Sequence, residues 1–379
     1  MDTTSYLTIG IAFLVAGIVA FATTPLVKKF AYVVGAVDVP KDNRRMHKTP
    51  MPRLGGLAIF FGFLIAILLF GSMDRVMASI LIGALIIVTL GIFDDILRLQ
   101  SWIKFIVQCA AACVPVLYGG LRIEFFTSFN LFSGDRFLYL GYLSIPITII
   151  WIVGMTNAVN FIDGLDGLAA GVSTIASLSL LAVSCITQNS YVAIVMACFT
   201  GACVGFLPYN LNPAKIFMGD TGALFLGFIL ATMSIQGLFK FYAVISFAVP
   251  FLILGLPLFD MIVSVLRRVL SGKSPMAADR EHIHHKLIDM GFNQKQAVAI
   301  LYGITIILGL IAVVLALYGA SAALLVLLGL LVIGVIVFKV LLRPKAPDAS
   351  ADPAQPAETS PTAEKVQSEA TDTPDGPAV

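Results

Sequence analysis

The stretch WIVGMTNAVNFIDGLDGLAAGVSTIASLSLLAV, residues 151–183, sets a polar motif between two apolar runs. The polar part, residues 157–171, contains two carboxylates, two carboxamides and three glycines. The flanking runs are apolar enough to cross a bilayer, where a buried carboxylate costs several kcal/mol. The stretch therefore predicts two membrane helices joined, at the edge of the lipid, by a polar segment that needs a functional reason.

The composition of the whole chain agrees with this interpretation. Of the 379 residues, 59% are hydrophobic and 12% are charged, whereas an average soluble domain carries about 25% charged residues. A soluble protein of this kind could not cover its own surface, so the sequence predicts an all-α polytopic membrane protein. The five cysteines lie in apolar runs and form no CxxC pair, which favours buried thiols over disulfides or a metal site.

About eleven stretches approach the roughly 20 apolar residues that a membrane helix needs. They begin near Tyr6, Leu54, Val76, Trp102, Tyr142, Leu168, Tyr191, Ile216, Tyr242, Ala297 and Ser321. Lys28 and Lys29 follow the first run instead of preceding it, so we expect a retained helix and not a cleaved signal peptide. When the loops alternate between sides, all but four of the 24 Lys and Arg residues fall on one side. The positive-inside rule makes that side cytoplasmic, with the N-terminus outside and the C-terminus inside.

Two segments lie outside this pattern of helices. Aromatic and β-branched residues flank a Ser-Gly-Asp turn within residues 119–141, which predicts a short extracytoplasmic β-hairpin. Residues 344–379 are rich in Pro, Ala, Glu, Thr and Asp and have no aromatic residue, so they are predicted to be a disordered cytoplasmic tail. Residues 1–343 then form the membrane domain.

Five aspartates gather on the predicted cytoplasmic side. Asp94 and Asp95 end the third span, Asp163 and Asp166 precede the sixth, and Asp220 begins the eighth. Neighbouring carboxylates repel one another, so such a cluster needs a cation, and hard oxygen ligands suit a Mg²⁺ ion that also binds phosphate oxygens. Helix capping explains each aspartate about as well when it is taken alone. Five aspartates on one face favour a shared metal and phosphate site.

Glycines surround two of these acidic motifs. Both motifs, residues 157–171 and residues 215–228, open a helix whose N-terminus is predicted to face the cytoplasm. The N–H groups at a helix start bind anions, and glycines let the backbone approach a phosphate closely. Tight packing between membrane helices is the alternative reason for the glycines. We expect free N–H groups at both helix starts to contact phosphate.

Two basic motifs lie in loops on the same predicted side. The members that we expect to bind substrate are Arg45, His47, Arg280, His282, His284 and His285. Cations and histidines beside carboxylates suit a metal-bound diphosphate. Attraction to anionic lipid is the alternative for the basic residues, and transition-metal binding is the alternative for the histidines. Asp260 shares a helix face with Arg267, and both an ion pair and a site-facing role are open for it.

Four motifs resemble those of the polyprenyl-phosphate N-acetylhexosamine-1-phosphate transferase family. They are GIFDDILRL (91–99), MTNAVNFIDGLDGLAAG (155–171), KIFMGDTGALFLGF (215–228) and DREHIHHKLIDMGF (279–292). The resemblance covers roughly residues 5–340 and keeps the order of the motifs. HIHHKL is similar to the GlcNAc-1-phosphate branch, whereas the muramoyl-pentapeptide branch typically carries three consecutive histidines. Ala223, where the family often has Ser, departs from the pattern.

The resemblance implies transfer of N-acetylhexosamine-1-phosphate, with GlcNAc-1-phosphate favoured, from a UDP-sugar to undecaprenyl phosphate, with release of UMP. The reaction is expected at the cytoplasmic face of a bacterial inner membrane, with Mg²⁺ or alternatively Mn²⁺ as cofactor. Asp220 and Asn157 are expected to bind the metal, and Asn160 to bind substrate. The residues expected to be catalytic are Asp94, Asp95, Asp163 and Asp166.

The expected partners are UDP-N-acetylhexosamine, undecaprenyl phosphate and membrane lipid, with no nucleic acid and with a homodimer left open. One-step transfer and a two-step path through a covalent aspartate are both open. A phospho-N-acetylmuramoyl-pentapeptide transferase is the nearest alternative. An ion-coupled transporter is more distant, because it should place its carboxylates near the membrane midplane. A CDP-alcohol phosphatidyltransferase follows its Asp-Gly motif with Ala-Arg and two further aspartates, and residues 163–179 lack this combination.

Overall fold

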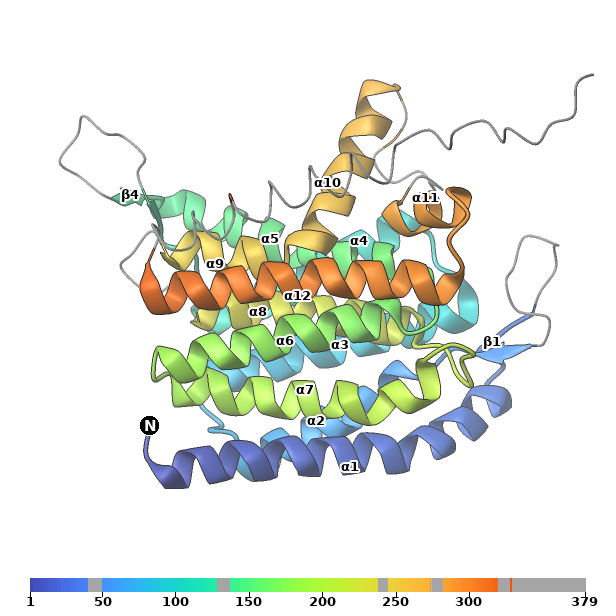
Figure 1. The fold of residues 1–379 in the computed structure, drawn as a ribbon, viewed down its shortest axis with the longest axis horizontal. Coiled ribbons are helices and arrows are strands. Elements are labelled where there is room, and N and C mark those ends of the chain that lie inside the picture. The colour runs from blue at the N-terminus through green and yellow to red at the C-terminus, as the bar shows by residue number, and fades with distance from the viewer. Residues whose placement is uncertain are drawn as a thin grey trace, which may run out of the picture. The chain divides into compact units, whose positions relative to one another are not determined.

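The structure, a computed structural model, consists mainly of long helices (Figure 1). It describes residues 1–39, 50–127, 137–237, 245–272, 274, 282–319 and 328. The described residues belong to one compact unit within residues 1–329. The predicted tail, residues 344–379, lies outside the described residues, as does the predicted span from Ser321 apart from Leu328.

The helices follow one another along the chain, with longer connections at residues 34–55 and 119–140. The α-helices of the described residues are α1 (Thr3–Val33), α2 (Gly56–Phe70), α3 (Arg75–Leu97), α4 (Ser101–Cys113), α5 (Ser144–Ile162), α6 (Leu168–Ile186), α7 (Ser190–Asn210), α8 (Gly219–Gly237), α9 (Ile245–Ile253), α10 (Gly255–Leu270), α11 (Ile283–Asp289) and α12 (Gln294–Tyr318). α4 continues as a π-helical segment, η1 (Val114–Tyr118), and a 3₁₀ turn, η2 (Gly141–Leu143), precedes α5.

Seven helical segments within the described residues are long and apolar enough to cross a membrane. They are α1, α3, α4 with η1, η2 with α5, α6, α7 and α12. The chain is thus a multi-pass membrane protein, while the count of eleven spans and their orientation stay predictions. The predicted span from Tyr242 contains two helices, α9 and α10, which meet at Leu254. Pro257 explains the break, because it lacks the N–H that would bond to the Ile253 carbonyl in a continuous helix.

α8 is the most enclosed helix of the bundle. Nearly all of its residues are buried, and it packs against both α3 and α5. A helix that is apolar all round must be surrounded by lipid or by other parts of the protein, and other helices surround α8. Around this centre, α1 packs against α7 and α2, and α6 packs against α7 and α12 (Figure 1).

Close contacts bring the first turn of α8 beside two other helix ends. A Cβ atom at Gly91 in α3, or at Gly56 at the start of α2, would collide with the backbone of α8. Glycine at these positions therefore lets the backbones touch, as small residues do in membrane bundles. Since Asp94 and Asp95 lie in the last turn of α3, the same contact sets both carboxylates beside the start of α8.

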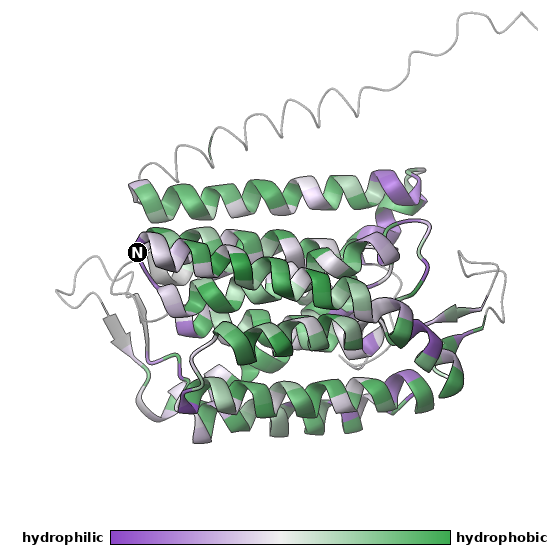
Figure 2. Cartoon of the chain, turned by 90° about the horizontal axis from the view of Figure 1, so that it is seen from below, coloured by the Kyte–Doolittle hydropathy of each residue, from purple (hydrophilic) through white to green (hydrophobic). Residues whose placement is uncertain are grey.

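Two short antiparallel strand pairs lie at opposite ends of the bundle (Figure 1). β1 (Val37–Asp38) pairs with β2 (Met51–Pro52), and β3 (Phe125–Thr127) pairs with β4 (Phe137–Tyr139). The second pair confirms the predicted hairpin, whose side of the membrane stays a prediction, and the first pair was not predicted. Figure 2 shows hydrophobic residues along the helices and hydrophilic residues gathered towards the helix ends.

Candidate functional site

The acidic motifs converge at the end of the bundle that carries β1 and α11 (Figure 1). Asp94 and Asp95 come from the last turn of α3, and Asp163 directly follows α5. Asp220 is the second residue of α8, which packs against both of these helices. The structure therefore brings residues from three separate stretches of sequence into one cluster.

The Asp95 side chain holds the start of α8. Its carboxylate accepts hydrogen bonds from the backbone N–H groups of Asp220 and Thr221, each at 3.0 Å, and from the Thr221 hydroxyl at 2.7 Å. Nη2 of Arg53 lies 3.6 Å from the same carboxylate. Gly219 has φ +72° and permits this approach, because a Cβ there would collide with Asp95. The prediction of N–H groups left free for phosphate is wrong at this helix start, since a carboxylate of the chain already binds them.

Lys104 of α4 joins two of the carboxylates. Its Nζ atom lies 2.8 Å from Oδ2 of Asp94 and 3.4 Å from Oδ2 of Asp220. The other Asp94 oxygen accepts a hydrogen bond from the backbone N–H of Leu99 at 2.8 Å. The Asp94 side chain is 4% exposed and the Asp220 side chain 22%. Asp220 is therefore the carboxylate of this pair that a ligand can reach.

The two carboxamides of α5 have different partners. Nδ2 of Asn160 donates to Oδ1 of Asp220 at 2.8 Å. One turn earlier, Nδ2 of Asn157 donates to Oε1 of Gln108 at 2.6 Å and to the Val153 carbonyl at 2.8 Å. The structure thus ties Asn160 to the acidic cluster and Asn157 to α4.

Two groups outside the membrane-spanning segments respond to this crowding of charge. Burial, followed by the nearby Asp220 carboxylate, raises the pKa of Asp163 to about 7. Burial opposes the charge of Arg53, but the carboxylates of Asp95 and Asp220 outweigh that effect and raise its pKa above the usual value. The Arg53 shift reflects the negative charge around it, and the Asp163 shift reflects mainly burial. Perturbed groups of this kind are typical of functional sites.

Asp166 contacts a different part of the chain. Its Oδ2 atom accepts hydrogen bonds from Nδ2 of Asn212 and from the backbone N–H of Ala214, each at 3.0 Å. Asn212 also donates to Oε1 of Gln294, at the start of α12, at 2.8 Å. Asp166 therefore fastens the loop that leads from α7 into α8.

The histidine motif packs against the turn between α5 and α6. The rings of His282 and His284 are parallel, with centroids 5.8 Å apart, and the Phe161 ring lies 5.5 Å from His282. The His284 imidazole lies against Gly164, and the ring centroids of His284 and His285 are 4.2 Å apart. α11 therefore covers the chain where it leaves α5.

His284 is buried, and its Nε2 atom has no hydrogen-bond partner among the described residues. Burial, followed by the neighbouring His285 and His282, lowers the pKa of His284 to about 4. This imidazole is therefore neutral at pH 7. It can bind a hydroxyl or a backbone group, but it supplies no positive charge to a diphosphate.

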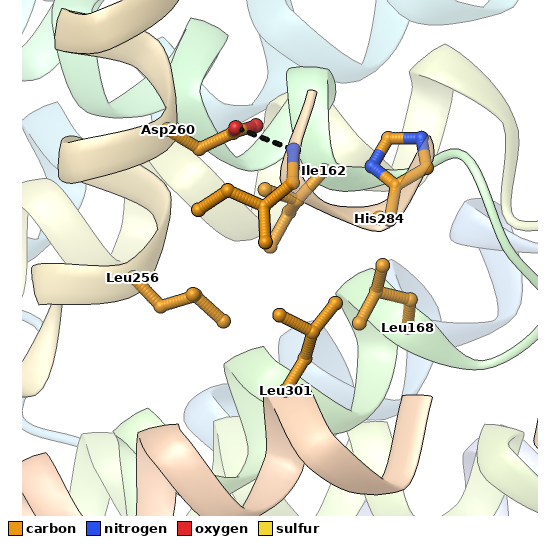
Figure 3. A pocket seen from close by; sticks show the side chains of 7 residues that line it. Ile162, Leu168, Leu256, Asp260, His284 and Leu301 are labelled. Atoms are coloured by element: carbon orange, nitrogen blue, oxygen red, sulfur yellow. Dashed lines mark hydrogen bonds between the residues drawn. The ribbon is translucent and has the colours of Figure 1, made fainter. Parts of the chain in front are cut away.

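A small apolar pocket lies beside α11 (Figure 3). Leucine and isoleucine side chains from α5, α6, α10, α11 and α12 line it, together with Asp260 and His284. Its cavity volume of about 10 Å³ is room for about one water molecule, far below the roughly 300–1,000 Å³ of pockets that hold small molecules. The acidic cluster, and not this pocket, is therefore the candidate substrate site.

The ligands available for a metal are hard oxygen atoms. Among the described residues, no three His, Cys, Asp or Glu side chains are arranged to hold a metal ion by themselves. Mg²⁺ commonly binds one or two carboxylates and takes its other ligands from water and substrate phosphates. A partly exposed Asp220 beside Asp94 fits that mode of binding and does not fit a complete protein cage.

Some predicted residues cannot be compared with the structure, and some site residues were not predicted. Arg45, His47 and Arg280 lie outside the described residues. Lys104 and Gln108 were missed, although the sequence carried a signal for them. They lie four residues apart on an apolar helix, so they share one face, and polar groups on one face of a membrane helix point into the protein.

Comparisons with known proteins give one family model and several relatives that the sequence resembles. The model described as "Glycosyl transferase family 4" matches residues 77–238, which run from α3 through α8. The chain is 40% identical to the probable undecaprenyl-phosphate N-acetylglucosaminyl 1-phosphate transferase of Bacillus subtilis, over 80% of this chain and 84% of that protein. It is 31% identical to the decaprenyl-phosphate N-acetylglucosaminephosphotransferase of Mycobacterium tuberculosis, over 76% and 78% of the two chains. It is 30% identical to the phospho-N-acetylmuramoyl-pentapeptide-transferase of Clostridium beijerinckii, over 75% and 93%.

Proposed function

The chain belongs to glycosyl transferase family 4, and from that membership we propose that it transfers N-acetylglucosamine-1-phosphate from the UDP-sugar to undecaprenyl phosphate. UMP is the second product. The donor sugar follows the names of the Bacillus and Mycobacterium relatives, and the undecaprenyl chain follows the Bacillus relative. The motif HIHHKL supports the same donor.

The reaction then takes place at the cytoplasmic face of a bacterial inner membrane. The distribution of Lys and Arg along the sequence supports this side. The meeting of α3, α5 and α8 at one end of an apolar bundle supports it as well, because a lipid phosphate and a water-soluble nucleotide sugar can both reach such an end. A transporter site at the membrane midplane would have no need of that position.

The observation that carries the proposal is the contact of Asp94, Lys104, Asn160 and Asp220. Three helices, α3, α4 and α5, supply partners around the first turn of α8. Holding charged groups beside lipid costs free energy, so such a cluster indicates use and not fold stability. Phosphoryl transfer depends mainly on positioning and on screening of charge, which fixed ionic groups of this kind provide.

Mg²⁺ is the proposed cofactor, with Mn²⁺ as the alternative. Asp220 is the residue that would hold the ion, and Asn160 orients its carboxylate through the bond to Oδ1. When bound, the ion would screen the negative charge of the donor diphosphate. The oxygen-rich ligands and the exposure of Asp220 support this choice.

The transfer forms one phosphorus–oxygen bond and breaks another. An oxygen of the acceptor phosphate bonds to the sugar-bearing phosphorus of the donor, and that phosphorus releases UMP. The second pKa of a phosphate monoester is about 6, so the acceptor is mostly dianionic at pH 7 and needs no strong base. The Asp94 carboxylate is held in place by Lys104 and by the backbone N–H of Leu99, so it is suited to orienting the acceptor phosphate. Both oxygens of Asp95 accept backbone hydrogen bonds from α8, so the role of Asp95 is to position Asp220. Because these oxygens are already occupied, a one-step transfer is favoured over an aspartyl intermediate on Asp95.

A donor panel tests the proposal. Purified protein with undecaprenyl phosphate and Mg²⁺ is supplied with UDP-GlcNAc, UDP-GalNAc or UDP-MurNAc-pentapeptide, and UMP release is measured. We expect the highest kcat/KM with UDP-GlcNAc and no UMP from the Asp220→Asn variant. A preference for the pentapeptide donor would make the chain a muramoyl-pentapeptide transferase. Absence of UMP with every donor would contradict the proposed function.

A further inference from the structure

Asp260 of α10 ties two helices together. Its Oδ2 atom lies 2.8 Å from Nδ1 of His282, and its Oδ1 atom accepts a hydrogen bond from the backbone N–H of Ile283 at 2.9 Å (the dashed line in Figure 3). His282 immediately precedes α11 and makes no side-chain cap of its own. A single carboxylate from α10 therefore caps α11 and holds the first histidine of the motif.

This contact restricts the chemistry of the imidazole. Asp260 is 3% exposed and His282 is 6% exposed, so water does not compete for the bond. An ionised carboxylate only accepts hydrogen bonds, so Asp260 favours a ring proton on Nδ1. The Ser264 hydroxyl, 3.3 Å from the same nitrogen, is the second polar group that faces it. Nε2 is then the ring nitrogen left for a ligand. Carboxylates that set the tautomer and orientation of a working histidine in this way recur in enzyme sites.

The histidine held by Asp260 packs against α5, the helix that also carries Asn160 of the acidic cluster. Phe161, whose ring is 5.5 Å from His282, directly follows Asn160. Asn160 in turn donates to the Asp220 carboxylate. Asp260 itself makes neither contact, so any influence on the reaction passes through His282 and α11.

We propose that Asp260 is a positioning residue for sugar-phosphate transfer, which fixes the orientation and the Nδ1–H tautomer of His282 so that Nε2 accepts a hydrogen bond from a hydroxyl of the nucleotide-sugar donor. The inference rests on the proposed function. Asp260 would thus influence the reaction although its side chain does not touch the acidic cluster that contains Asp220.

The variant Asp260→Asn tests the tautomer directly. The amide oxygen can still accept from the Ile283 N–H, which leaves the amide NH₂ facing Nδ1 and shifts the ring proton to Nε2. Full-length protein labelled with ¹⁵N-histidine reports the tautomer by NMR, with the His282 signals assigned through His282→Gln. We expect Nδ1–H in the native chain and Nε2–H in the variant. An Nε2–H tautomer in the native chain would overturn the inference, whether or not the variant folds.

Kinetics separate positioning from a structural role. We expect Asp260→Asn to lower kcat/KM for UDP-GlcNAc about 10- to 100-fold, and to change it less than about threefold in a His282→Gln background. The control Asp289→Asn makes the same change at the exposed end of α11 and should leave kcat/KM unchanged. Equal losses in both backgrounds, with a matching fall in Tm, would overturn the inference. Absence of UMP release from the native chain would instead contradict the proposed function. The NMR measurement of the His282 tautomer does not depend on activity, so the two failures can be told apart.

Discussion

The Asp95 carboxylate lies 3.0 Å from the backbone nitrogen of Asp220, and this contact joins the end of α3 to the start of α8. Its second oxygen binds the next backbone N–H, so the helix start is capped by a side chain from another helix. The adjacent Asp94 instead shares Lys104 with the Asp220 side chain. Two neighbouring aspartates therefore act on one residue, the first on its side chain and the second on its backbone.

The change Asp95→Asn should lower both stability and activity. The amide places an NH₂ group where a carboxylate oxygen accepted a backbone hydrogen bond, and an unpaired buried N–H costs about 1–3 kcal/mol. Thermal unfolding of the purified protein and UMP release measure the two effects. The matched variant Asp220→Asn removes one charge from the crowded cluster and keeps the backbone bonds of α8. It should abolish UMP release without lowering Tm, and equal falls in Tm would contradict this division of roles.

The change Lys104→Met should make the protein more dependent on divalent cations for stability. Asp94 and Asp220 then lose the cation that lies between them, so their mutual repulsion remains until another cation binds. Added Mg²⁺ should raise the Tm of this variant by more than it raises the Tm of the native protein, because a ligand stabilises the state that binds it. Thermal unfolding with EDTA and with Mg²⁺ measures the difference.

The control for this experiment is Lys215→Met. Lys215 lies over the Tyr209 ring, with Nζ 5.9 Å from the ring centroid. It lies shortly before the start of α8, so this variant also removes one positive charge near that helix start. Its response to Mg²⁺ should equal that of the native protein. A response to Mg²⁺ in Lys104→Met no larger than in this control would show that Lys104 does not screen the two carboxylates.

The helices and the set of residues in the acidic cluster could both be predicted from the sequence, but for different reasons. Helix length and polarity depend on composition, so α1, α3, α5, α6, α7 and α12 correspond to predicted spans. The cluster was predictable because its motifs all lie at helix ends on one side. The hairpin of β3 and β4 was readable from a local turn, whereas the pairing of β1 with β2 depends on a segment that gave no such signal.

The hydrogen-bond partner of each residue in the cluster could not be predicted from the sequence. These pairings depend on how each helix is rotated about its axis and on how far it is shifted along that axis. Asp94 and Asp95 are adjacent, but successive residues point about 100° apart around a helix, so packing decides which one meets the backbone of α8. Asn157 and Asn160 share a face of α5, yet a rise of about 4.5 Å separates them. One therefore reaches Gln108 and the other reaches Asp220.

The change Tyr302→Phe should loosen the turn that precedes α6. The Tyr302 hydroxyl donates to the Gly167 carbonyl at 2.5 Å and links α12 to this turn. Loss of the bond leaves the Gly167 carbonyl with the backbone N–H of Gly171 as its remaining partner, at 2.9 Å. Losing one such hydrogen bond costs about 1 kcal/mol, and UMP release should fall with Tm. Tyr318→Phe is the control, because Tyr318 is 71% exposed at the far end of the same helix. Identical behaviour of the two variants would mean that the hydroxyl of Tyr302 does not hold the turn.

The change His284→Gln should reduce the loss of stability in acid. The pKa of His284 is lowered from 6.5 to about 4 by burial and by its histidine neighbours. As the pH falls from 6.5 towards 4, the unfolded chain binds a proton that the folded chain does not, so the native protein loses up to about 3 kcal/mol. Glutamine cannot titrate, so the difference in Tm between pH 7.5 and pH 5, measured by thermal unfolding, should shrink. His285→Gln keeps the buried imidazole and should retain most of that difference, and an unchanged difference in His284→Gln would show that this ring is not held neutral by the fold.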